Sequence, residues 1–178
     1  QLAKLHVRAV KESGALEKGI KVWHLEWLRG IEFQTFTNIR KGWDLVQACN
    51  KLLGHNLFKV LVDAAHCGDS DLSKEENIAI INEMGERDGF SMFHASAKTT
   101  RGCLTTAEDW VNDLLEACVK TGKLETVFVE VFHHEDAALQ GLRDAVEGHG
   151  VDTTKGRTYS EVVRDGYIAV ANKINSLV

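Results

Sequence analysis

The chain has 178 residues, 44% of them apolar and 26% charged, which is the composition of an ordinary globular protein with one buried core. Its formal net charge of -5 and its scattered Lys and Arg residues argue against a nucleic-acid partner, and no apolar run approaches the ~20 residues of a membrane span. Four widely separated cysteines without a CxxC pair favour reduced thiols, so we expect a cytoplasmic protein.

Apolar patterning predicts one helix, then four strand–helix units, then a final helix. The first helix is interrupted near Gly14 or Gly19. The predicted strands cover residues 20–26, 58–63, 89–94 and 126–132, and the predicted helices cover residues 1–18, 37–53, 74–87, 106–119, 138–148 and 160–174. Strands that alternate with helices indicate an α/β fold with a parallel sheet.

Local signals support several of these boundaries. Ser73 and Glu76 have the spacing of a capping box, which marks the start of a helix. Thr105 or Thr106 is placed to cap the helix that follows the third strand. Gly54 ends the helix before the second strand, because glycine readily takes the left-handed conformation found at helix ends.

Each predicted strand ends at, or runs through, a residue that can bind a metal ion. These residues recur at roughly the spacing of one strand–helix unit, and in a parallel barrel such strand ends converge on one rim. They are Glu26, Asp63, His94 and Glu130. Side chains alternate along a strand, so Glu26 shares its face with His24, and Glu130 shares its face with Phe128. The pattern predicts a site for a divalent cation.

The same segments, taken in order, resemble the C-terminal half of the xylose-isomerase-like TIM barrels, which include sugar isomerases, ketose 3-epimerases and inosose dehydratase. Glu26 matches the metal-binding residue of strand five, Asp63-x-x-His66 the motif of strand six, His94 the residue of strand seven and Glu130 that of strand eight. The resemblance implies that residues 1–178 are a single partial domain, holding only the C-terminal four βα units of a parallel (β/α) barrel of the TIM type.

The resemblance also implies a cofactor and a reaction. Glu26, Asp63, His94 and Glu130 would bind one divalent cation, Mn²⁺ or Mg²⁺, with Co²⁺ as a third candidate. Glu26 and Glu130 would exchange protons at the two faces of a substrate, through an enediolate. The implied activity is isomerisation or epimerisation of a small sugar, a sugar phosphate or a hydroxy-ketone.

Three further residues are candidates for substrate binding. By the resemblance, His66 would contact a substrate oxygen and Arg101 would match a substrate-binding arginine. Trp27 follows Glu26 directly and is the tryptophan best placed to form a pocket wall. Glu32 would replace Glu26 as the ligand if the first strand ended later than predicted.

Only four of the eight strands of a complete barrel are predicted. A four-strand half would expose two sheet edges and an apolar interior. Two copies of the chain would close the barrel, as would a separate N-terminal half. The third possibility is that the chain is a piece of a longer one, which its opening in mid-helix without Met favours.

Other functions fit the pattern less well. A lyase of the inosose-dehydratase type would use the same metal site. Residues 56–77 and 93–110 resemble two degenerate EF-hands, which predicts an all-helical interaction module without calcium binding, because Ala65 and Ala97 replace the first ligands. An endonuclease of the endonuclease IV type would need a basic groove and more histidines, and a barrel without catalysis is the remaining alternative.

Overall fold

The computed structural model describes residues 1–30, 33–97, 109–130, 137, 140–145 and 156–178. Its strands are β1 (Trp23–Leu25), β2 (Phe58–Asp63), β3 (Phe90–Ala95) and β4 (Thr126–Val129). Its helices are α1 (Leu2–Ser13), α2 (Ile39–Leu53), α3 (Ala64–Gly68), α4 (Lys74–Glu86), α5 (Asp109–Lys120), α6 (Gln140–Ala145) and α7 (Tyr159–Asn175). The predicted alternation of strands and helices is confirmed.

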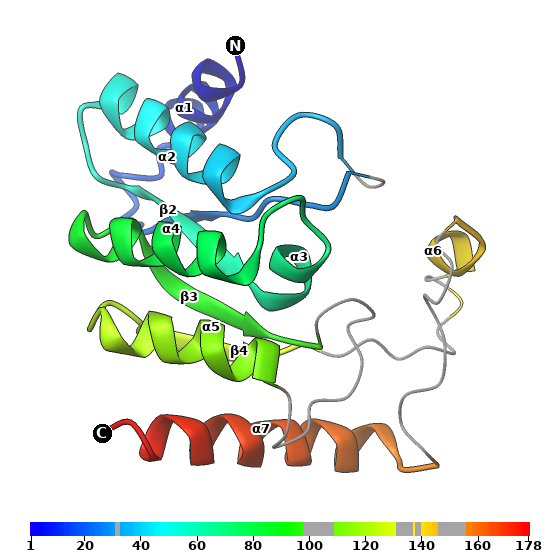
Figure 1. The fold of residues 1–178 in the computed structure, drawn as a ribbon. Helices are drawn as coiled ribbons and strands as arrows, with labels where there is room; N and C mark the ends of the chain where they lie inside the picture. The colour runs from blue at the N-terminus through cyan, green and yellow to red at the C-terminus, as the bar shows by residue number, and fades with distance from the viewer. Residues whose placement is uncertain (31–32, 98–108, 131–136, 138–139, 146–155) are drawn as a thin grey trace.

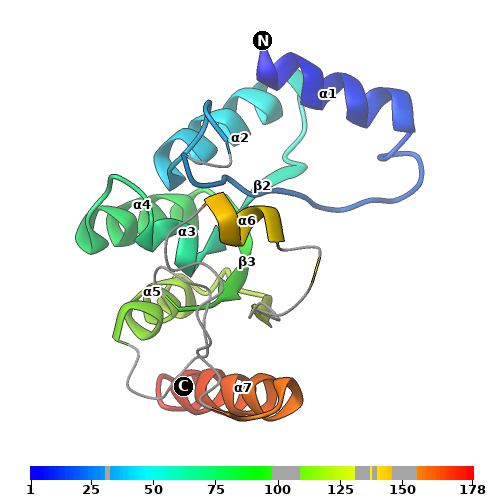
Figure 2. The same cartoon turned by 90° about the vertical axis from the view of Figure 1, so that its right-hand side faces the viewer.

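The four strands form one parallel sheet in the order β1-β2-β3-β4. Helices α1, α2, α4, α5 and α7 follow one another along the sheet in the same direction, and both views place the two chain ends at opposite ends of this row (Figures 1 and 2). Consecutive neighbours in a parallel sheet with helical crossovers are the arrangement of a (β/α) barrel. The described residues form half of such a barrel.

The register of the sheet brings the strand ends to one rim. Asp63 and His94 are direct partners across β2 and β3, and the backbone N–H of Glu130 donates a hydrogen bond of 2.9 Å to Ala95 O. The pairing of β2 with β3 shifts by one residue between Val60 and Leu61. From Leu61 to Asp63 the pairing is regular. Three of the four predicted ligands are thus held by the sheet itself.

The hydrophobic core lies between the sheet and the helices. Phe58, Val60 and Val62 alternate along β2 and belong to this core, so Lys59 and Asp63 lie on the opposite, barrel-interior face. Lys59 is buried there and forms an ion pair of 2.8 Å with Asp88. The helices therefore cover one face of the sheet, and the other face carries the polar residues of the barrel interior.

Capping chemistry explains the helix boundaries. Asn38 caps α2, and Ser73 and Glu76 form the predicted capping box of α4. Thr158 and Glu161 form a second capping box at α7, which the sequence prediction missed.

Several predicted elements differ from those observed. β1 has three residues instead of seven, and residues 64–68 form the short helix α3, which was not predicted. Thr105 and Thr106 lie outside the described residues, where the helix is seen from Asp109 onwards. The EF-hand alternative is wrong, because residues 58–63 and 90–95 are paired strands and not helices.

Both edges of the described sheet are unpaired. β1 pairs with β2 alone and β4 with β3 alone. Phe128, on the interior face of β4, is 45% exposed. Over the described part of the chain, no helix has the length and apolar character needed to cross a membrane.

Candidate metal centre

Four side chains from four strand ends meet at the rim of the half-barrel, and we call them the ligand cluster. They are Glu26, one residue beyond β1, Asp63, the last residue of β2, His94 in β3, and Glu130, one residue beyond β4. One potential ligand atom from each lies within 4.8 Å of the corresponding atoms of the others. The structure therefore brings together all four residues that the sequence pattern predicted as ligands.

The ring of His94 occupies the middle of the cluster. Its Nδ1 atom lies 3.5 Å from Asp63 Oδ2, 3.5 Å from Glu130 Oε2 and 3.9 Å from Glu26 Oε1. These distances exceed the usual range for an N–H···O hydrogen bond, and this buried nitrogen has no hydrogen-bond partner among the described residues. The three carboxylates therefore surround the imidazole nitrogen at distances longer than a hydrogen bond.

The spacing of the cluster suits a small cation. Around an octahedral ion with ligands at about 2.1 Å, neighbouring ligand atoms lie about 3.0 Å apart and opposite ones about 4.2 Å apart. The separations in the cluster are only slightly larger than these. A donor set of three carboxylates and one imidazole favours Mg²⁺ or Mn²⁺ over metals that prefer thiolates.

The electrostatics of the cluster favour a positive charge at its centre. Burial of the His94 imidazole lowers its pKa, but interactions with the Asp63 and Glu130 carboxylates outweigh burial and raise the pKa to about 9. Without a metal, His94 is therefore protonated at neutral pH. The same negative field would attract a divalent cation.

Asp63 is the most firmly held member of the cluster. Its side chain is completely buried, and its Oδ1 atom accepts a hydrogen bond of 2.7 Å from the backbone N–H of His66, which caps α3. Trp110 Nε1 donates a hydrogen bond of 2.8 Å to Ala64 O, which fastens α3 to α5. The cap fixes the carboxylate so that Oδ2 faces His94.

His66 and Trp27 lie next to the cluster. His66 is buried, and its Nε2 atom lies 3.2 Å from Glu26 Oε1. The Trp27 indole is also fully buried, with its ring centroid 6.4 Å from that of His66 and its edge against Gly42. Trp27 thus packs behind His66, and direct contact of either residue with a substrate stays a prediction.

Other candidates from the sequence fall outside the described residues. These are Arg101 and Glu32. Phe128 is a neighbour of the cluster that sequence reasoning did not predict. Alternation along the strand placed it on the same face as Glu130, but its contact with His94 was not expected. The Phe128 ring and the His94 ring are in T-shaped contact, with centroids 5.6 Å apart.

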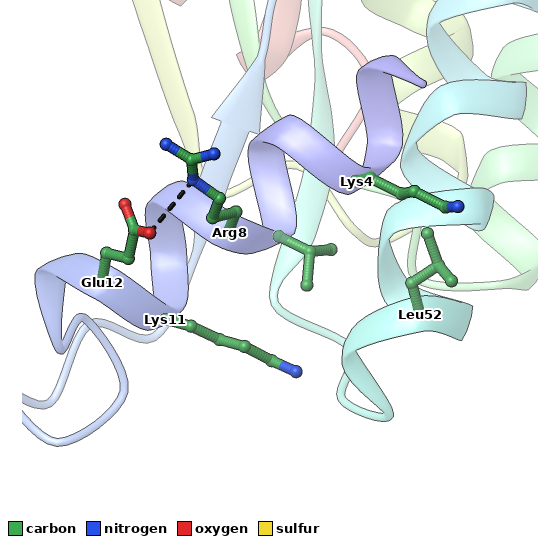
Figure 3. A pocket seen from close by; sticks show the side chains of 6 residues that line it. Lys4, Arg8, Lys11, Glu12 and Leu52 are labelled. Carbon is green, nitrogen blue, oxygen red and sulfur yellow. Dashed lines mark ion pairs between the residues drawn. The ribbon is translucent and has the colours of Figure 1, made fainter.

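A pocket between α1 and α2 lies apart from the cluster (Figure 3). Arg8 in this pocket forms an ion pair of 3.0 Å with Glu12, and both side chains are largely exposed. The pocket is lined by Lys4, Val7, Arg8, Lys11, Glu12 and Leu52. None of these residues belongs to the cluster, so the chemistry of the strand ends does not extend to this pocket.

The fold is half of a parallel (β/α) barrel, and the ligand cluster lies at the rim formed by its strand ends. The solved structure of D-psicose 3-epimerase with D-tagatose from Clostridium cellulolyticum H10 superposes on this chain with a TM-score of 0.69 and 19% sequence identity. The match covers 98% of this chain and 56% of the epimerase, so this chain spans little more than half of that protein. No protein-family model matches the chain, and no curated protein does. The likeness confirms the predicted fold.

Proposed function

We propose that this chain carries the divalent-cation site of an isomerase or epimerase that acts on a small sugar, sugar phosphate or hydroxy-ketone. One observation carries the proposal: three carboxylates and one imidazole from four consecutive parallel strands gather within 4.8 Å. They do so at the rim where barrel enzymes carry out their chemistry. The similar fold of a sugar epimerase supports this class of substrate.

The ligand cluster would hold one Mn²⁺ or Mg²⁺, with Co²⁺ as a third candidate. When bound, the cation would supply electrostatic stabilisation for negative charge on the substrate oxygens. The negative field that raises the pKa of His94 supports this assignment.

Burial divides the carboxylates into two kinds. The Asp63 side chain is 0% exposed and caps α3, which suits a purely structural ligand. The Glu26 and Glu130 side chains are 30% and 24% exposed, so both are more accessible than that of Asp63. They come from the first and last strands of the sheet, on either side of His94.

We assign Glu26 and Glu130 as the two bases. One would remove a proton next to the substrate carbonyl and the other would return a proton to the opposite face, through an enediolate. His66 Nε2, 3.2 Å from Glu26 Oε1, would orient that carboxylate, and His66 is kept as a candidate for contact with a substrate oxygen. Trp27 would support His66 from behind, and Arg101 is kept as a candidate for the substrate.

Metal stoichiometry of the purified chain tests the proposal. We expect one Mn²⁺ per chain by electron paramagnetic resonance, and loss of most of this binding in the Glu130→Gln variant. Glu86→Gln removes an exposed carboxylate on α4 and is the matched control. Equal binding by both variants would contradict the assignment, and a dehydrated product in an activity assay would favour the lyase alternative.

A complete active site needs more of the barrel. We propose that four further parallel βα units pair with the open edges of β1 and β4 and cover Phe128. They would belong to an N-terminal half or to a second copy of this chain. Light scattering distinguishes these sources, because a second copy gives a dimer of 178-residue chains.

The thiols support a reducing compartment. Cys49, Cys67 and Cys118 are free and buried among the described residues. Burial raises the pKa of Cys49 to about 11 and that of Cys67 well above its ordinary value, so both are unreactive thiols. We propose the cytoplasm on this basis.

A further inference from the structure

Glu26 is held differently from the other members of the ligand cluster. Asp63 and His94 are paired in register, and Glu130 donates a backbone hydrogen bond to β3. The pairing of β1 with β2 ends at Leu25, one residue before Glu26, and β1 is an edge strand of only three residues. Beyond the sheet, the Glu26 carboxylate is placed by its own contact with His66, 3.2 Å away, and by the contacts of the residues that follow it.

An ion pair three residues beyond Glu26 joins this segment to α3. Arg29 Nη1 donates a hydrogen bond of 3.1 Å to Asp69 Oδ2, with side chains only 8% and 17% exposed. Asp69 is the C-cap of α3, three residues after His66. The two segments thus have two links with the same spacing, Arg29 to Asp69 and Glu26 to His66.

The burial of this ion pair suggests a role in geometry. Burying two charges costs free energy, and their mutual attraction barely offsets this cost. Replacing a buried ion pair with apolar side chains therefore often leaves the stability of a protein unchanged. A guanidinium–carboxylate bond is directional, which an apolar contact is not. Arg29 O also accepts a backbone hydrogen bond of 2.9 Å from Phe33 N–H. Both the side chain and the backbone of Arg29 are therefore held in place.

We propose that the Arg29–Asp69 ion pair is a positioning element that holds Glu26 against His66 and within reach of the cation. This inference rests on the proposed function for the cation. It assigns Arg29 and Asp69 no contact with metal or substrate. The pair acts on Glu26 through the backbone of residues 26–29 and on His66 through α3.

A double variant can show whether the ion pair positions Glu26 or only stabilises the fold. In the double variant Arg29→Met/Asp69→Leu, apolar side chains replace both charges, so we expect native circular dichroism and little loss of stability. We also expect Mn²⁺ affinity to fall about tenfold by titration calorimetry, a typical effect of removing support around a metal ligand. The ¹⁵N shift of the His66 imidazole in the metal-free chain should move as well, because its contact with Glu26 changes.

A single substitution supplies the matched comparison. Asp69→Asn breaks the ion pair, whereas Asp71→Asn neutralises an exposed carboxylate two residues away that accepts a hydrogen bond of 2.8 Å from Asn38. We expect Asp69→Asn to weaken Mn²⁺ binding and Asp71→Asn to leave it unchanged. The double variant decides the question if Asp69→Asn does not fold.

The outcomes distinguish the two proposals. Unchanged Mn²⁺ affinity and an unchanged His66 shift in the double variant would overturn the positioning role while leaving the metal site intact. If the unaltered chain binds no Mn²⁺, the proposed function fails, and the His66 shift still reports whether the pair positions Glu26. A folded double variant with weaker binding and a moved shift supports the inference.

Discussion

Asp63 and His66 are joined by a hydrogen bond of 2.7 Å in which the Asp63 side chain accepts from the His66 backbone. The bond begins α3 directly after β2 and leaves the second carboxylate oxygen facing His94, 3.5 Å away. One side chain therefore serves as a helix cap and as a candidate metal ligand. The Asp-x-x-His spacing in the sequence is the spacing of this cap.

Substitution of Asp63 should separate its two roles. Asn keeps an oxygen that can accept the capping bond but removes the charge, whereas Ala removes both. We expect both variants to lose Mn²⁺ binding, and Asp63→Ala to be less stable than Asp63→Asn by about 1 kcal/mol, the usual contribution of a cap. Urea denaturation and calorimetry check the two effects, and strong Mn²⁺ binding by Asp63→Asn would contradict the ligand assignment.

The stability of the metal-free chain should depend on the protonation of His94. Folding raises the pKa of this residue from 6.5 to about 9. A raised histidine pKa adds stability that is fully present below pH 6.5 and is lost as the pH rises through 9. We expect this contribution to decline between these values and to vanish in His94→Gln, as measured by chemical denaturation at several pH values.

The affinity for Mn²⁺ should change with pH in the opposite direction. Because a metal ligand must be deprotonated, binding displaces the proton from His94. Apparent affinity should therefore rise from pH 6.5 to about 9. Calorimetry in buffers of different ionisation enthalpy measures the released proton, and binding without proton release at pH 7 would contradict this account.

Added Mn²⁺ should stabilise the folded chain. At a free concentration one hundred times the dissociation constant, binding to the native state alone raises the free energy of unfolding by about 2.7 kcal/mol. The Glu130→Gln variant should lose most of this increment, and Glu86→Gln should keep it. A thermal shift equal in all three proteins would indicate binding elsewhere on the surface.

Helix α7 presses closely on the strand that carries Glu130. A Cβ atom at Gly166 would lie 2.6 Å from Val129 Cγ1, which is closer than such atoms approach in proteins. We expect Gly166→Ala to cost about 1–3 kcal/mol of stability through overpacking. Gly141→Ala, where the added atom meets nothing within 4 Å, is the control. Equal stability of the two variants, measured in urea, would contradict this packing.

Much of the fold follows from the sequence because its signals are local. The prediction of β2 at residues 58–63 is confirmed in full, since a short, mostly apolar run lies between Gly54 and the capping box of α4. The gathering of the ligand cluster also follows, because parallel strands end at one rim. Their roles as ligands stay a prediction.

Other features depend on contacts between distant residues. The five residues of α3 are too few for helical periodicity, and their helix depends on the Asp63 cap. β1 is shorter than its apolar run because only residues 23–25 find partners in β2. The Arg29–Asp69 pair joins residues 40 positions apart, and nothing in either local sequence indicates it.

The most direct test of the central claim is anomalous X-ray diffraction from crystals of the chain grown with Mn²⁺. We expect a single strong manganese peak at the ligand cluster, with carboxylate oxygens of Glu26, Asp63 and Glu130 and the Nδ1 atom of His94 as ligands. A fully occupied manganese ion bound elsewhere, or no peak at a saturating concentration, would contradict it.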